Sequence, residues 1–128
     1  MADEDRPDSG RKRRRLSRSG DFDRVYREGD SRGNRFLVVY SFARGEDDRG
    51  DAPRLGVSVG RRIGKAVSRN KVKRTVREAF WDLAGELPEG SDYVIVARPG
   101  VKGLVEREGG AGVREQLAEL LGPEERLS

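Results

Sequence analysis

The chain has 128 residues, of which 39% are charged and 34% hydrophobic, so we expect one domain with a small core. It contains no cysteine and no histidine, which excludes a disulfide framework, thiolate zinc sites and imidazole-based catalysis. No apolar run approaches the length of a membrane span or of a secretion signal. A cytoplasmic protein is therefore expected.

The N-terminal segment is polar and ends in the basic run Arg11–Arg15. This composition predicts a disordered basic tail over residues 1–15 that is attracted to phosphates. A nuclear-localisation signal is also compatible with the run, although a single basic pentapeptide is a weak signal. We place the folded domain at residues 16–122 and a short C-terminal tail at residues 123–128.

A short helix is predicted over Ser19–Glu28, with Gly29 at the position of a C-terminal cap. Val25 is expected to point into the core. Phe22 and Tyr26 lie one turn apart, and spacing alone favours the core for this pair as well. Aromatic rings beside a basic groove can instead stack on unpaired bases.

Three strands are expected. Arg35–Phe42 is nearly continuously apolar and rich in β-branched and aromatic residues, and Asp92–Arg98 has the same character. Between them, Arg54–Gly60 alternates between branched apolar residues and the small residues Gly56 and Ser58. A face of small residues lets a ligand or another backbone come close.

Two segments are rich in glycine. The first joins the first two strands, and its four acids between residues 46 and 51 predict a solvated hairpin loop, because their spacing specifies no metal site. The second, residues 101–112, is expected to be irregular. A last amphipathic helix is then predicted over Val113–Leu121, ended by Gly122.

The strongest feature is the stretch Arg61–Phe80, in which eight cations precede the first acid, Glu78. From about Ser68, an expected N-cap, the pattern becomes helical and continues to about residues 85–88. One face of this helix carries the apolar residues Val72, Val76, Ala79 and Leu83. A helix face that contacts only solvent normally carries both acidic and basic residues. The face opposite the apolar one carries cations without acids, which indicates a polyanion partner. The small Val and Ala side chains argue against a membrane surface or a calmodulin-like groove.

This stretch resembles the signature of the protein subunit of bacterial ribonuclease P, a strand and a small-residue turn followed by R-N-x-x-K-R-x-x-R-E on a helix. The matching positions are Arg54, Gly56, Ser58, Gly64, Ala66, Arg69, Asn70, Lys73, Arg74, Arg77 and Glu78. The match continues upstream through Phe22, Tyr26, Gly29, Asn34, Arg35 and Tyr40 and downstream through the Asp92–Arg98 strand, and it covers roughly residues 16–121. Lys71 departs from the arginine that the family often has, which keeps the charge but loses a bidentate guanidinium.

The resemblance implies a fold. The family has an α/β (α+β) two-layer sandwich with a small mixed central sheet, like that of the second domain of the fifth small-subunit ribosomal protein. Its central helix forms a left-handed β-α-β crossover, whereas the general rule for such units predicts the right-handed form.

The resemblance also implies a function. The family's protein is the RNA-binding subunit of an endoribonuclease that removes the 5′ leader of precursor tRNA. Its partners are the catalytic RNA and precursor tRNA, with no membrane and no obligate protein partner. Catalysis and Mg²⁺ are expected mainly in the RNA, so no catalytic or metal-binding residue is assigned to the polypeptide.

By position, the resemblance assigns two sets of binding residues. The catalytic RNA would be bound by Arg61, Arg62, Lys65, Arg69, Asn70, Lys71, Arg74 and Arg77. The leader would be bound by Phe22, Tyr26, Tyr40, Ser58 and Lys73. Two alternatives remain open, namely a ribosomal or rRNA-binding protein of similar fold without a role in cleavage, and a protein-only nuclease with a carboxylate-bound metal.

Overall fold

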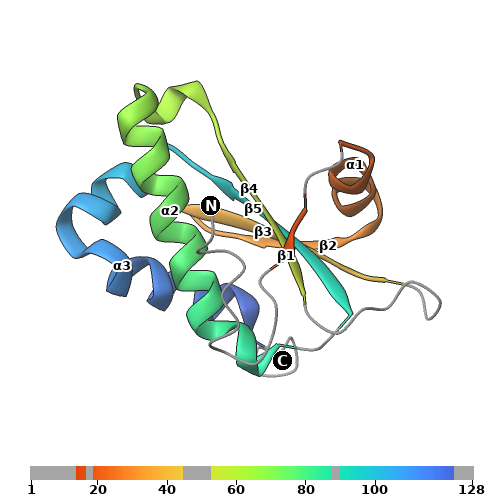
Figure 1. The fold of residues 1–128 in the computed structure, drawn as a ribbon. Helices are drawn as coiled ribbons and strands as arrows, with labels where there is room; N and C mark the ends of the chain where they lie inside the picture. The colour runs from red at the N-terminus through yellow and green to blue at the C-terminus, as the bar shows by residue number, and fades with distance from the viewer. Residues whose placement is uncertain (1–13, 17–18, 45–52, 88–89, 123–128) are drawn as a thin grey trace.

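The computed structural model describes residues 14–16, 19–44, 53–87 and 90–122, which form one sheet and the helices on its two faces (Figure 1). In chain order the elements are β1 (Arg14–Arg15), α1 (Ser19–Glu28), β2 (Asp30–Gly33), β3 (Leu37–Ala43), β4 (Arg54–Val59), the 3₁₀ turn η3 (Arg61–Ile63), α2 (Ala66–Leu83), the 3₁₀ turn η4 (Ala84–Glu86), β5 (Ser91–Ala97) and α3 (Gly100–Leu121). None of the helices described is long and apolar enough to cross a membrane.

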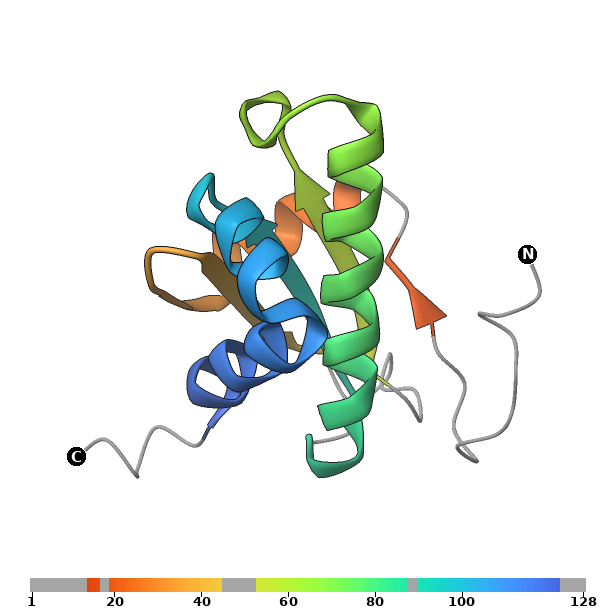
Figure 2. The same ribbon diagram turned by 90° about the vertical axis from the view of Figure 1, so that its left-hand side faces the viewer.

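The sheet is mixed, with the strand order β1-β4-β5-β3-β2. β4 and β5 are parallel neighbours joined by α2, while β3 runs antiparallel to both β5 and β2. Helices α2 and α3 lie side by side on one face, and α1 lies on the other (Figure 2). The predicted α+β sandwich around a small mixed sheet is confirmed.

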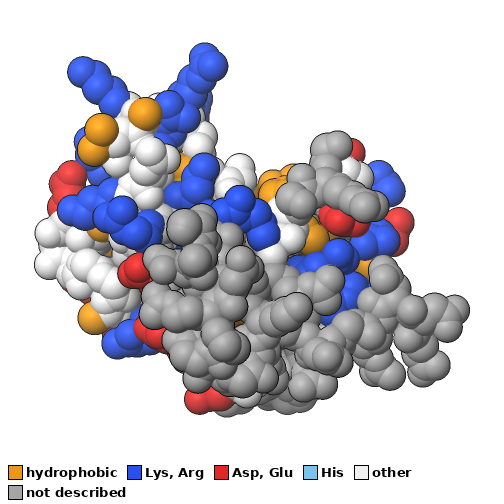
Figure 3. Space-filling model, viewed as in Figure 1, with side chains coloured by type: hydrophobic (Ala, Val, Ile, Leu, Met, Phe, Trp, Pro, Cys, Tyr) orange, Lys and Arg blue, Asp and Glu red, His pale blue; other side chains and the backbone are white. Residues whose placement is uncertain are grey.

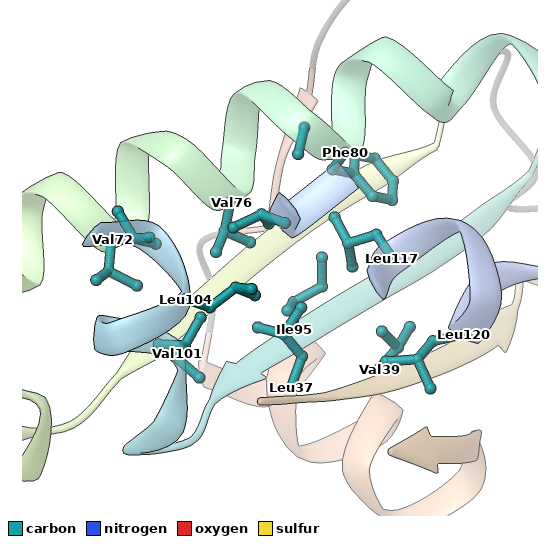
Figure 4. Packing of buried hydrophobic residues seen from close by; sticks show 14 of the residues in the cluster. Leu37, Val39, Val72, Val76, Phe80, Ile95, Val101, Leu104, Leu117 and Leu120 are labelled. Carbon is teal, nitrogen blue, oxygen red and sulfur yellow. The ribbon is translucent and has the colours of Figure 1, made fainter. Parts of the chain in front are cut away.

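The main core lies between the sheet and the α2–α3 layer, and it forms because strands alternate their side chains between two faces. Residues of β5 such as Tyr93 and Ile95 point toward α2 and α3, whereas Val94 points toward α1. Figure 4 shows the core side chains of α2, α3 and β5 directed toward one another, among them Val72, Val76, Phe80, Leu104, Leu117 and Ile95. Of the apolar face predicted for the central helix, Val72, Val76 and Ala79 are buried and Leu83 is partly buried, as expected.

The second core, under α1, is smaller. Val25 is fully buried there with Leu16 and Val94, which confirms its predicted orientation. Gly29 ends the helix as predicted, with its N–H donating to the Val25 carbonyl at 2.9 Å. A side chain at Gly29 would overlap the Ser41 carbonyl, so close approach of α1 to β3 requires glycine at this position.

The N-terminal boundary of the domain differs from the predicted one. Arg14 and Arg15 form β1, which pairs in parallel with β4, whereas the predicted disordered tail extended through residue 15. The pairing follows because Leu16 is buried and donates its N–H to the Leu55 carbonyl at 2.8 Å. The remainder of the predicted tail, the acidic loop at residues 46–51 and the C-terminal tail lie outside the described residues.

Residues 101–112 were predicted to be irregular, and this prediction is wrong. They belong to α3, whose only non-helical backbone is at Gly109, with φ 63° and ψ −151°, where two helical segments meet at a kink. Val101, Leu104 and Val105 are buried against the sheet and α2. Burial of these side chains offsets the roughly 1 kcal/mol by which each glycine disfavours a helix relative to alanine.

Strand β2 was not predicted, because the sequence DSRG has neither apolar alternation nor high strand propensity. Its contacts with distant residues hold it in place. The Arg32 guanidinium donates from Nη1 to the Gly122 carbonyl at 2.5 Å, at the C-terminal end of α3. Asn34 donates from Nδ2 to Gln116 Oε1 at 2.9 Å.

A buried ion cluster joins the start of β4, the start of β5 and α1. Asp92 is fully buried and accepts two hydrogen bonds of 2.8 Å from Arg54, through Nε and Nη2. Arg44, itself buried, donates to Asp92 Oδ1 at 2.5 Å. Arg24 of α1 lies 3.7 Å from Asp92 Oδ2 and 3.2 Å from Asp21 Oδ1. The cluster therefore ties α1 to the first residues of β4 and β5.

Replacing Asp92 with alanine is expected to lower the free energy of unfolding by roughly 3–5 kcal/mol, because the buried ion pairs of Asp92 with Arg44 and Arg54 would be lost. Chemical denaturation measures this loss. Asp82→Ala is the matched control, since it removes an exposed carboxylate paired with Arg114 at 3.0 Å and should cost less than about 1 kcal/mol. Equal losses in the two variants would contradict the role given to Asp92.

Candidate nucleic-acid interface

The cations of η3 and α2 form one surface of the molecule. Because Val72 and Val76 are buried beneath α2, Asn70, Lys71 and Arg74 are exposed on its opposite side. We call this region the cationic surface, and it comprises Arg61, Arg62, Lys65, Arg69, Lys71, Lys73, Arg74 and Arg77. Figure 3 shows Lys and Arg side chains gathered over α2 and the turn before it. The orientation predicted for the central helix is confirmed.

The turn between η3 and α2 holds the start of this surface in place. Gly64 has φ 148°, a backbone conformation that residues with side chains rarely adopt. Arg69 donates from Nε to the Gly64 carbonyl at 3.1 Å, so this arginine stabilises the turn in addition to lying on the cationic surface. Arg74 makes no such contact with the turn among the described residues. Replacing Arg74 therefore removes a charge without disturbing the turn.

The helix starts earlier than predicted. Lys65, rather than Ser68, occupies the N-cap position, and no side chain caps the helix there. The first turn contains no acid either. The positive end of the α2 dipole therefore coincides with the cations of η3, which adds to the positive potential of this end of the molecule.

An aromatic cluster lies on the other face of the sheet. The rings of Tyr26 and Tyr40 meet edge to face with centroids 4.9 Å apart, and those of Phe22 and Tyr26 lie 6.4 Å apart. The side chains of Tyr26 and Ser58 are hydrogen-bonded. Burial raises the pKa of the Tyr26 phenol above its ordinary value, and the Ser58 hydrogen bond opposes part of that shift. Tyr26 is nevertheless 39% exposed, so one side of this cluster is open to a ligand.

The sheet register explains why these residues meet. Gly56 of β4 and Tyr40 of β3 both pair with Val94 of β5, which places them in one row across the α1 face. The Phe22 ring packs directly on Gly56, where a side chain would overlap it. The predicted close approach to the small-residue face is thus made by an aromatic ring of the chain itself.

Four of the five residues assigned to the leader come together in the structure, namely Phe22, Tyr26, Tyr40 and Ser58. Lys73 lies on α2, in the layer on the opposite face of the sheet, where it is half-buried. By its position it belongs to the cationic surface rather than to the aromatic cluster. The residues assigned to the catalytic RNA all lie on η3, on α2 or in the turn between them.

Two features near the cationic surface were not predicted from the sequence. Val67 is 81% exposed in the first turn of α2 and lies outside the buried face formed by Val72, Val76 and Ala79. Lys102 of α3 lies near the Gly64 turn, with its Nζ 3.8 Å from the position that a Cβ on Gly64 would occupy. Nothing in the local sequence around Lys102 signals this proximity, because it depends on how α3 packs beside α2.

The described residues do not fit a metal ion. No group of three or more acidic, histidine or cysteine side chains lies together in the part of the chain that the structure describes. The carboxylates of Asp21 and Asp92, which lie near each other, contact the guanidinium groups of Arg24 and Arg54. A cation at those oxygens would have to displace arginines.

Gly56→Ala is expected to displace the Phe22 ring and to lower the free energy of unfolding by about 1–3 kcal/mol, the usual cost of overpacking. Gly60→Ala, directly after the same strand, is the control, because nothing lies within 4 Å of a Cβ at that position. Denaturant titration of both variants measures the difference. A neutral Gly56→Ala would show that Phe22 is not held against the sheet.

Comparison with known proteins agrees with the fold. The sequence model of the family described as Ribonuclease P matches residues 11–121. The Ribonuclease P protein component of Geobacillus thermodenitrificans is 40% identical over 113 residues, covering 87% of this chain and 86% of that protein. The RNase P protein from Thermotoga maritima has a similar structure, with a TM-score of 0.73 and 40% identity over 85% of this chain and 96% of that one. For the Staphylococcus aureus RNase P protein the TM-score is 0.70 and the identity 33%, with 86% and 94% covered. The chain therefore belongs to the ribonuclease P protein family, the protein components of an RNA–protein endoribonuclease.

Proposed function

We propose that this protein binds the catalytic RNA of ribonuclease P through its cationic surface and the 5′ leader of precursor tRNA through its aromatic cluster. The observation that carries the proposal is the division of the molecule into these two sites. The cationic surface lies on α2 and the turn before it, with no acid in the first turn of the helix, and partly exposed aromatic rings occupy the opposite face of the sheet. Such a protein can contact a structured RNA and a single strand at the same time.

The cationic surface would act by electrostatics. The exposed side chains of Arg61, Arg62, Lys65, Lys71 and Arg74 make no ion pair with the described acids. Binding phosphates with these side chains would release counterions from the RNA, and this release favours association. The protein would thereby reduce repulsion where two RNA chains meet.

The aromatic cluster would act by stacking. Every base has a face that can stack on an aromatic ring, so such a site accepts a single strand with little sequence preference. Tyr26 offers the most accessible ring, while Phe22 is fixed by its packing on Gly56. A tyrosine with its ordinary pKa of about 10 is already uncharged at neutral pH, and burial raises the Tyr26 pKa further, so the phenol would not repel phosphates.

The chemistry would belong to the RNA. Mg²⁺ supplies an activated water and charge neutralisation in phosphodiester hydrolysis. The Asp21 and Asp92 carboxylates are engaged by arginines and do not fit the ion, so we propose that the RNA holds it. The protein's contribution is then to bind and orient both RNA partners, in the cytoplasm.

Reconstitution tests the proposed function directly. The purified protein, added to its catalytic RNA at low Mg²⁺, should accelerate removal of the leader from precursor tRNA. Sequencing of RNA that co-purifies with the protein should return one structured species. Recovery of rRNA instead, with no effect on cleavage, would identify a ribosomal RNA-binding protein, and cleavage without any added RNA would identify a protein-only nuclease.

Arg74→Ala should weaken binding to the catalytic RNA and reduce the slope of log affinity against log salt concentration by about one, because one phosphate contact is lost. Fluorescence anisotropy at several salt concentrations measures both quantities. Arg27→Ala is the charge-matched control, since Arg27 is an exposed arginine of α1 located 3.7 Å from Glu28. If both variants lose affinity equally, binding depends on net charge and not on the cationic surface.

Tyr26→Ala should weaken binding of precursor tRNA to the reconstituted particle by about tenfold, because stacking of one base is worth roughly 1–3 kcal/mol. Phe22→Ala should have a similar effect once its folding has been checked. Mature tRNA lacks the leader, so its affinity should hardly change. Tyr26→Phe keeps the ring and loses only the hydrogen bond to Ser58, and it should retain most of the affinity.

The two tRNA forms give this experiment its control. Equal losses for precursor and mature tRNA in the alanine variants would mean that the rings support the fold or the RNA scaffold. The aromatic cluster would then have no role in recognising the leader.

A further inference from the structure

We propose that Lys102 of α3 and the Gly64 turn together form a contact for an RNA backbone phosphate, outside the helical signature on α2. The inference rests on the proposed function, because it extends the cationic surface onto a third element. It adds a binding residue that lies far along the chain from the arginines and lysines of η3 and α2.

The position of Lys102 carries the argument. Its Nζ lies 3.8 Å from the point that a Cβ on Gly64 would occupy, so the ammonium group is beside the turn that begins α2. Arg69 donates to the Gly64 carbonyl from the same turn, at 3.1 Å. A cation from α3 and a guanidinium from α2 therefore flank one glycine.

The glycine allows Ser68 and Lys102 to lie close to the turn. Gly64 has φ 148°, and a Cβ at this position would lie only 3.1 Å from Ser68 Cβ. Lys102 is exposed, and an ammonium group on a flexible stem binds phosphate as a point charge. A phosphate oxygen that approaches the turn from solvent can therefore reach the exposed Lys102 Nζ.

No acid neutralises these charges within the described part of the chain. The first turns of η3, α2 and α3 contain no acidic residue. Lys102 has no ion-pair partner among the described residues, whereas Arg114 on the same helix pairs with Asp82 at 3.0 Å. Cations gathered without acids repel one another, and a polyanion relieves that repulsion.

RNA fits this contact better than a membrane does. Lys102 lies beside the turn that begins α2, so a polyanion bound to the cationic surface can also reach its ammonium group. Val67 is the exposed large apolar side chain near it among the described residues, and one valine does not provide the apolar face that a membrane-bound helix needs.

The test is Lys102→Ala, measured with full-length protein and catalytic RNA over a range of salt concentrations. We expect about a fivefold loss of affinity near 0.15 M salt and a reduction of the salt slope by about 0.9, as for one phosphate contact. Lys102→Glu should lose more affinity, and Lys102→Arg should keep most of it. Arg114→Ala is the control on the same helix, and thermal unfolding checks that each variant folds.

The phosphate could belong to the catalytic RNA or to precursor tRNA, and two measurements distinguish these sources. A loss when the protein alone binds the catalytic RNA assigns the phosphate to that RNA. A loss only when the reconstituted particle binds precursor tRNA assigns it to the substrate. If Lys102→Ala and Arg114→Ala give the same affinities in both measurements, the inference is wrong.

The Arg74→Ala variant separates this failure from a failure of the proposed function. If Arg74→Ala weakens binding and Lys102→Ala does not, the RNA-binding role of the cationic surface is supported and only its extension to Lys102 of α3 is wrong. If the unmodified protein binds RNA without salt dependence, the electrostatic basis of both is wrong.

Discussion

The burial of both faces of β5 is the constraint on which the rest of the structure depends. Tyr93 and Ile95 point into the α2–α3 layer, and Asp92 and Val94 point under α1. A strand buried on both faces cannot shift its register, because a shift of one residue would exchange the two sets of side chains. β5 therefore fixes the positions of β4 and β3, which carry Ser58 and Tyr40 of the aromatic cluster.

Charge is distributed in two different ways in the same small domain. At the start of β4 and β5, the arginines at 24, 44 and 54 surround Asp92 and Asp21, so these cations serve the fold. At the opposite end of these strands lie the exposed cations of η3 and of the first turns of α2 and α3, and these turns contain no acid. The same residue types thus stabilise the protein at one end and remain available to phosphates at the other.

Two glycines connect the fold to the candidate sites. Gly56 lets the Phe22 ring lie directly on β4, which brings α1 close enough for Tyr26 to reach Ser58. Gly64 adopts the backbone conformation that joins η3 to α2, and Arg69 secures its carbonyl. Both positions require the absence of a side chain. A larger residue at Gly56 would displace α1, and one at Gly64 would displace the start of α2, so each would alter a candidate site indirectly.

The sequence by itself determined the helix over Ser19–Glu28, the three principal strands and the orientation of α2, because these depend on local periodicity and the strands are apolar. It also determined the family, since the signature on α2 is contiguous in the chain. Only the tertiary structure decided that residues 100–108 are helical, because burial of Val101 and Leu104 overcomes the glycines around them. Likewise β1 and β2 exist through pairing with distant strands, and Lys102 reaches the Gly64 turn because α3 packs beside α2. Contacts between residues far apart in the chain have no local signal, and so the sequence could not reveal them.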